Sequence, residues 1–348
     1  MAYIPEETHN TMSSSQVEPN DILLNITGAS IGRSCIVPGD FYEGNVNQHV
    51  CIIRLNDGHY SKFYQSFLSS YSGQKAIQTN QAGGGREGLN FQGVRDIKLS
   101  VPKIEEQQKI ADFLSSVDKK IEQLTEKHRL LTEYKKGVMQ QIFTQKIRFK
   151  DDNGNDYPEW NSSKFGDVFT RVTRKNKENN LNVMTISAQQ GLINQEKYFN
   201  KSVSASDVTG YYLLKKGEFA YNKSYSAGYP MGAIKRLNRY DEGCLSTLYI
   251  CFEAKEKGLP EFFEQYFEAG MLNHEIKKIA QEGARNHGLL NISVVEFFRD
   301  IKIDFPCMEE QQKIANFLTA IDQKIDQAWS TLEQTKAFKK GLLQKMFV

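Results

Sequence analysis

The sequence predicts an α+β protein built as a tandem of two globular units of mixed α/β structure, separated by a pair of long antiparallel coiled-coil helices. Segments 102–143 and 306–347 align without a gap, and 19 of 42 positions are identical. Each carries apolar side chains at alternating steps of four and three, the narrow seam that a coiled-coil helix presents to a partner. The regions before them, 1–101 and 151–305, alternate short apolar runs with turn residues, as strands and loops do.

The repeated segment has the charges of a long helix. Glu105 and Glu106 lie at its expected N-terminus and Lys135 and Lys136 near its other end, as the helix dipole favours. A helix of about 38 residues would be about 57 Å long at about 1.5 Å per residue. We expect the two copies to pair with each other about a local two-fold axis; the alternative is that each packs on its own globular unit. The seam residues expected in the helix pair are Ile110, Leu114, Val117, Ile121, Ile314, Leu318, Ile321 and Ile325.

The first globular unit is expected over 1–101. Residues 21–37 read as strand, tight loop and strand, because apolar runs flank a Gly/Ser/Thr turn. A further strand is expected at 50–55 and a helix at 60–70. Residues 79–88 read as a mobile glycine-rich loop, and 97–101 as a short strand leading into the first long helix.

The second unit is expected over 151–305, where a polar Gly/Asn-rich linker at 150–157 leads into a globular part that starts at about Pro158. Its predicted elements are strands at 183–187, 218–222 and 248–252 and a helical stretch at 259–281, and residues 301–305 lead into the second long helix. The expected domains are therefore 1–101, 102–150 (helix and linker), 151–305 and 306–348 (second helix).

The two units resemble each other weakly, and the first is shorter. When their strands are aligned, Tyr3 falls opposite about Tyr198. The first unit therefore lacks a counterpart of roughly 158–197, and we expect it to be the less stable and weaker-binding of the two.

Composition excludes several classes of protein. No run of about 18 apolar residues predicts a membrane span, and the first residues do not read as a secretory signal. Five cysteines without CxxC spacing favour free thiols in a cytoplasmic protein over disulfides or zinc. Net charge is +2, and only 102–150 is clearly basic, with 11 basic and 7 acidic side chains. DNA contact by the globular units would have to come from local patches.

No catalytic motif is found. The chain has no GxxxxGK[ST] phosphate loop, no HExxH and no metal-like His/Cys cluster. Asp300 and Lys302 could be read as a nuclease-like acid-x-Lys motif. Asp96 and Lys98 occupy the same place before the first helix, however, and alternating strand residues explain both pairs better. A nuclease stays the disfavoured alternative.

Polar and basic loops make nucleic-acid contact a hypothesis, against the alternative of ordinary solvated loops. Lys and Arg hold phosphates, while amide and hydroxyl side chains can read base edges. The candidates are Asn25, Thr27, Ser30, Arg33, Arg86, Arg171, Arg174, Lys175, Lys177, Lys223, Ser224, Tyr225, Ser226, Tyr229, Lys235 and Arg285.

Two copies of P-x-x-E-E-Q-Q-K-I-A-x-F-L, each opening a long helix, together with the loop LLNITGASIGR at 23–33, resemble the specificity subunit of Type I restriction-modification enzymes over essentially the whole chain. The resemblance implies that each globular unit is a target-recognition domain that reads half of a split sequence in double-stranded DNA. It implies that the helices set the spacing and dock two methylation subunits, and that restriction subunits join them. It also implies that the chain has no active site, since S-adenosylmethionine, ATP and Mg belong to the partner subunits.

The short first unit departs from this pattern. It keeps open the alternative of a coiled-coil scaffold or a partly inactive, truncated DNA-binding subunit without enzymatic activity. Gln107, Gln108, Gln311 and Gln312 recur at the helix starts, and we expect them to be exposed partner sites.

Overall fold

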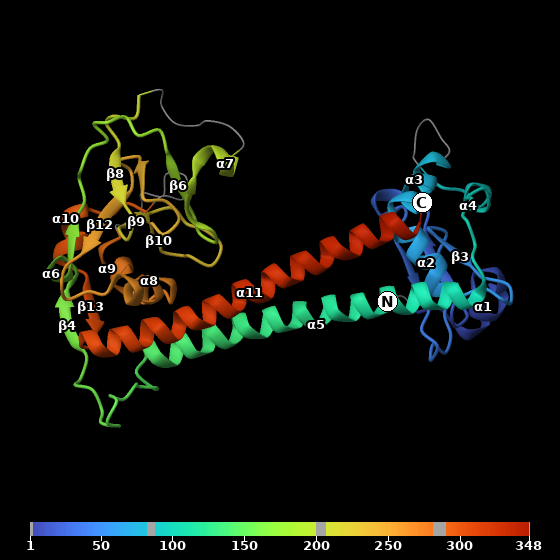
Figure 1. Cartoon of the computed structure of the whole chain (residues 1–348), viewed down its shortest axis with the longest axis horizontal. Coiled ribbons are helices and arrows are strands. Elements are labelled where there is room, and N and C mark those ends of the chain that lie inside the picture. Colours follow the sequence, from blue (N-terminus) through green and yellow to red (C-terminus); the bar gives the residue numbers. More distant parts are fainter. Residues whose placement is uncertain (1–2, 82–87, 200–206, 281–289, 348) are drawn as a thin grey trace. The chain divides into compact units, whose positions relative to one another are not determined.

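The computed structural model describes residues 3–81, 88–199, 207–280 and 290–347 (Figure 1). The chain divides into two compact units: unit 1 is Met1–Arg129 with Asp326–Val348, and unit 2 is Leu130–Ile325. The two long helices are confirmed as α5 (Ile104–Phe143) and α11 (Met308–Met346). Each long helix contributes one part to each unit, so the compact units do not follow the division of globular and helical segments drawn from the sequence.

Unit 1 is built on a three-stranded antiparallel sheet of order β2-β1-β3. The strand, loop and strand expected at 21–37 are β1, a 3-10 turn and β2. Buried Ile22 and Leu24 of β1 pack toward Phe63 and Phe67 of α2. Its elements besides the long helices are α1 (Glu6–Thr11), η1 (Ser13–Ser15), β1 (Ile22–Asn25), η2 (Gly28–Ser30), β2 (Ser34–Ile36), β3 (Val50–Ile53), α2 (Ser61–Ser69), α3 (Tyr71–Thr79) and α4 (Phe91–Arg95).

Unit 2 is built on a four-stranded antiparallel sheet of order β10-β9-β12-β5, with two-stranded pairs β6–β7, β8–β11 and β4–β13. Its elements are β4 (Asn161–Lys164), α6 (Phe165–Val168), β5 (Phe169–Arg171), β6 (Met184–Ser187), β7 (Gly191–Asn194), α7 (Gln195–Phe199), β8 (Tyr212–Lys215), β9 (Phe219–Asn222), β10 (Ala233–Arg236), β11 (Glu242–Leu245), β12 (Ile250–Ala254), α8 (Pro260–Glu268), α9 (Asn273–Ile279), α10 (Val294–Arg299) and β13 (Lys302–Phe305). The helical stretch expected at 259–281 is two helices, because Gly270 takes a left-handed φ of +73° after α8.

Apolar clusters cover both faces of the unit 2 sheet. On one face, Phe219 and Phe252 stack with their ring centroids 5.4 Å apart, in the cluster that includes α8. On the other face, Ala220 and Cys251 are buried in a second cluster that includes side chains of β6, β7, β8 and β11.

The corresponding outer face of the unit 1 sheet is open. Leu23 and Ile52 occupy the positions of Ala220 and Cys251 in the strand pairing, but both are only half-buried. They line a cavity of about 1340 Å³ together with Cys35, Val50 and Phe41 among others. The two sheets therefore differ in how their outer faces are covered, while the weaker stability and DNA binding expected of the first unit stay predictions.

The strand expected at 97–101 is absent, which corrects the sequence interpretation. Its counterpart in unit 2 is β13, whose residues Lys302–Phe305 pair with Asn161–Lys164 of β4. Within the described residues, nothing pairs with 97–101 in this way. A strand needs a partner for its backbone groups, so similar sequence gives different structure in the two units.

The long helices run antiparallel within each unit. In unit 1, Asp118 of α5 pairs with Lys339 of α11 at 2.5 Å. In unit 2, Lys135 of α5 pairs with Asp322 of α11 at 2.6 Å. Residues 118 and 322 are separated by the repeat offset of 204, and so are 135 and 339. The same ion pair is therefore formed twice, at equivalent positions of the repeat.

The helices also pack on the globular part of their unit, so the two arrangements weighed from the sequence coexist. In unit 1, Phe347 lies 5.3 Å from Phe63 of α2, ring centroid to ring centroid. In unit 2, its repeat equivalent Phe143 lies 5.8 Å from Phe262 of α8. The expected seam residues lie as follows: Leu114, Val117, Ile314, Leu318 and Ile321 are buried, and Ile110, Ile121 and Ile325 are half-buried.

Gln107 and Gln311 are not exposed partner sites, contrary to expectation. Each is 1% exposed, whereas Gln108 and Gln312 are exposed. The Gln107 amide accepts a hydrogen bond from the Tyr60 backbone at 3.0 Å and donates one to the Pro102 carbonyl at 2.9 Å. Gln311 does the same with the Leu259 backbone at 2.8 Å and the Pro306 carbonyl at 2.9 Å. These glutamines tie each long helix to the start of α2 or α8.

Candidate nucleic-acid interface

The loop between β9 and β10, Lys223 to Met231, carries five of the predicted contact residues. Ser226 to Tyr229 form a tight turn, with the Tyr229 amide donating to the Ser226 carbonyl at 2.8 Å. Gly228 takes a φ of +85° in this turn, as a type II turn requires. Tyr225 is 66% exposed, and Lys223 has no side-chain partner within the described residues. The loop thus presents an exposed aromatic ring beside the turn, with the half-buried Lys223 at its start.

A second basic group surrounds Tyr212 of β8. Arg171 donates to the Tyr212 hydroxyl at 3.3 Å, and the Lys175 ammonium lies 4.5 Å from the centre of the Tyr212 ring. Lys177 is exposed nearby in sequence. In the part of the chain that the structure describes, none of these three cations forms an ion pair. Their charges are therefore available to an anionic ligand such as a phosphate backbone.

Two other predicted contact residues are already neutralised. Arg174 binds both oxygens of the Glu218 carboxylate, at 2.7 and 2.8 Å. Lys235 is paired with Glu268 at 2.5 Å, and its side chain is only 12% exposed. The structure gives both cations a direct role inside the unit, while a DNA contact by either stays a prediction.

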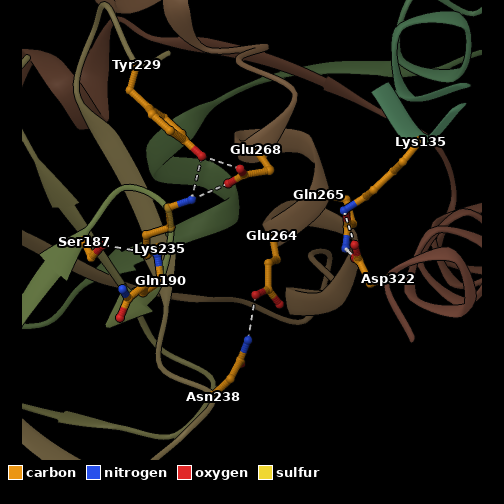
Figure 2. A network of polar contacts seen from close by, with 10 residues as sticks. All are labelled: Lys135, Ser187, Gln190, Tyr229, Lys235, Asn238, Glu264, Gln265, Glu268 and Asp322. Carbon is orange, nitrogen blue, oxygen red and sulfur yellow. Dashed lines mark hydrogen bonds and ion pairs between the residues drawn. The ribbon is translucent and has the colours of Figure 1, made fainter. Parts of the chain in front are cut away.

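The partner of Lys235 belongs to an acidic face of α8 (Figure 2). Glu261, Glu264 and Glu268 recur at steps of three and four, and Arg236 pairs with the first two at 2.5 and 3.4 Å. Burial raises the pKa of Glu264, although Arg236 and Asn238 oppose the shift. The spacing of these glutamates was visible in the sequence, but not that their cations lie on β10.

In unit 1, Thr27, Ser30 and Arg33 lie on the shorter loop between β1 and β2, and Asn25 is the last residue of β1. The Thr27 hydroxyl and His49 Nδ1 are 2.6 Å apart. Arg33 is exposed, and the Asn25 backbone bonds with both Gly32 and Arg33. Ser30 ends the 3-10 turn η2. Arg86 and Arg285 lie outside the described residues.

No cluster of three His, Cys, Asp or Glu side chains suited to a metal ion occurs within the described ranges. None of the helices described there is long and apolar enough to cross a membrane.

Comparison with known proteins gives a consistent result. The chain is 22% identical over 366 residues to the MjaX specificity subunit of a type I restriction enzyme from Methanocaldococcus jannaschii, covering 99% of this chain and 81% of that one. Among solved structures it is similar to the S subunit of a Type-I restriction-modification system from M. genitalium, with a TM-score of 0.58 and 18% identity over 97% of this chain and 85% of that one. A structure from work on type I R-M complex assembly and conformational transition gives a TM-score of 0.51 and 15% identity over 95% of this chain and 82% of that one.

The chain has two globular parts of mixed helix and strand, each followed by a long helix. This is the fold of type I restriction-modification specificity subunits. The family model described as Type I restriction modification DNA specificity domain matches residues 5–132 and 150–334, so the chain belongs to that family. The family is non-catalytic, and methylase and nuclease activities lie in other subunits.

Proposed function

We propose that this chain reads a bipartite sequence in double-stranded DNA, with one half read by the globular part of each unit. Two observations carry this proposal. The cations around Tyr212 form no ion pair within the described residues, and the loop after β9 is fixed by hydrogen bonds at its turn. Phosphate contacts position a protein on DNA, and exposed polar and aromatic side chains can then reach bases. The division into recognition domains at 1–101 and 151–305, with helical segments at 102–150 and 306–348, is part of this proposal.

The partners we propose are two methylation subunits, joined by restriction subunits, acting in the cytoplasm. S-adenosylmethionine, ATP and Mg would be held by those partners. Tyr134 and Phe338 support two equivalent docking sites, because they are separated by the repeat offset and are 54% and 55% exposed. Exposed aromatic side chains are frequent anchors of protein interfaces.

Replacing Lys177 and Lys223 by alanine together should weaken DNA binding across all sequences. Each phosphate contact contributes about −0.9 to the slope of log K against log salt. Loss of two contacts should therefore make this negative slope shallower by about 1.8. The measurement is duplex binding by the chain with its methylation subunits at several salt concentrations.

The matched control is Lys257→Ala with Lys277→Ala, which removes two exposed lysines of unit 2 that have no side-chain partner within the described residues. It should leave the slope unchanged. Equal slopes for the two double variants would show that Lys177 and Lys223 do not contact DNA. If the unmodified chain with its methylation subunits binds no DNA, the result would favour the alternative of a coiled-coil scaffold over a DNA-reading subunit.

A further inference from the structure

The loop from Lys223 to Met231 is fixed to unit 2 at three places. At its start, the Lys223 carbonyl accepts a hydrogen bond from the Leu290 amide at 3.0 Å. At its end, the buried Tyr221 hydroxyl donates to the Met231 carbonyl at 2.6 Å. In between, the Tyr229 side chain reaches the end of α8. A loop held in this way keeps its exposed turn in one orientation.

The third attachment is a compact polar triad of Tyr229, Lys235 and Glu268 (Figure 2). The Tyr229 hydroxyl donates to the Glu268 carboxylate. The Lys235 ammonium donates to the same hydroxyl at 3.0 Å and to Glu268 at 2.5 Å. It also lies 4.6 Å from the centre of the Tyr229 ring. Each member therefore contacts the other two, so removal of either polar partner weakens the attachment of the tyrosine.

Arg236 forms a second ion-paired group between β10 and α8, and this group serves as a comparison for the triad. Arg236 follows Lys235 on β10, and its partners Glu261 and Glu264 lie toward the start of α8. No hydrogen bond or ion pair joins this group to the loop from Lys223 to Met231 within the described residues. Both ion pairs join β10 to α8, but only the Glu268 pair includes a loop side chain.

We propose that Lys235 and Glu268 are positioning residues for DNA recognition, which hold Tyr229 so that the turn presents Tyr225 and Ser226 to bases of one half-site. This inference rests on the proposed function, and it gives Lys235 and Glu268 a role in specificity that needs no DNA contact by either side chain. A pre-ordered loop avoids the cost of ordering on binding, and a base contact is sensitive to small displacements.

The test uses the full chain with its methylation subunits and a pool of duplexes with randomised sequence. Tyr229→Phe keeps the ring over Lys235 and removes the hydroxyl, and Glu268→Gln removes the carboxylate charge. Each variant should lower the preference for one half of the enriched motif about tenfold and leave the other half sharp. The double variant should be no worse than either single change, because both remove one interaction. Salt dependence should not change, since no phosphate contact is lost.

Glu261→Gln is the control, because it weakens the neighbouring ion pair, and both halves of its motif should stay sharp. The inference would be overturned if both halves of the motif lost sequence preference equally, or if the control lost it in the same way. Either result would show a general loss of structure. An unchanged motif in Tyr229→Phe and Glu268→Gln, with a changed one in Tyr225→Ala, would overturn the positioning role and leave DNA reading intact. If the unmodified complex enriches no motif, the proposed function fails and this inference fails with it.

Discussion

Replacing Arg148 by methionine should lower the free energy of unfolding of unit 2 by about 3–5 kcal/mol, the usual cost of breaking a buried ion pair from one side. Glu310, in the first turn of α11, is fully buried. Arg148 Nε and Nη2 donate to its two carboxylate oxygens at 3.0 and 2.9 Å. Arg148 Nη2 also donates to the Pro158 carbonyl at 2.7 Å. The substitution would therefore leave a charged carboxylate and a backbone acceptor without their partner.

This loss can be measured by chemical denaturation in a Trp329→Phe background, where the remaining Trp160 reports on unit 2. Lys313→Met is the control, because its partner Asp152 is 94% exposed and such surface pairs contribute about 0–1 kcal/mol. Adding Glu310→Gln to Arg148→Met should recover part of the loss by removing the buried charge. Equal effects of Arg148→Met and Lys313→Met would contradict this account of Glu310.

Replacing Tyr134 and Phe338 together by alanine should abolish stable binding of both methylation subunits. Truncation of an aromatic anchor commonly costs about 2 kcal/mol or more per site, over tenfold in affinity. Tyr134→Ala alone should weaken one site and Phe338→Ala the other. Mass measurement of the purified complex at fixed concentration counts the bound subunits.

Gln123→Ala with Gln327→Ala is the matched control, since these exposed glutamines are also separated by the repeat offset. It should leave two subunits bound. Two subunits retained by the aromatic double variant would place the docking sites elsewhere on the chain.

The sequence allowed prediction of the features that depend on local pattern. The long helices followed from the seam that runs through both copies, and β1 and β2 from apolar runs around a glycine turn. In each case the residues that decide the structure lie next to one another along the chain. The fold class was therefore accessible before any three-dimensional information.

Features that depend on distant partners could not be predicted in this way. Glu106 and Glu310 occupy the same position of the repeat, yet Glu106 is exposed and Glu310 is buried against Arg148. Lys235 looked like a free cation because its partner Glu268 lies 33 residues away on α8. Residues 97–101 have the sequence of a strand, but no strand pairs with them in the described part of the chain. Burial and pairing are properties of the assembled fold, and a single sequence does not display them.

The central claim is that the paired helices hold two DNA-reading units at a fixed spacing. The direct test inserts one heptad into each helix, after Arg129 in α5 and after Gln327 in α11, which keeps the apolar seam in register. Seven residues add about 10.5 Å at about 1.5 Å each, close to three base pairs of about 3.4 Å.

The measurement is a map of methylated adenines in DNA modified by each chain together with its methylation subunits. For the unmodified chain we expect two short sequences separated by a constant number of unread base pairs. For the lengthened chain we expect the same two sequences with a gap wider by about three base pairs. A continuous motif, or a gap that does not change when both helices are lengthened, would contradict the claim.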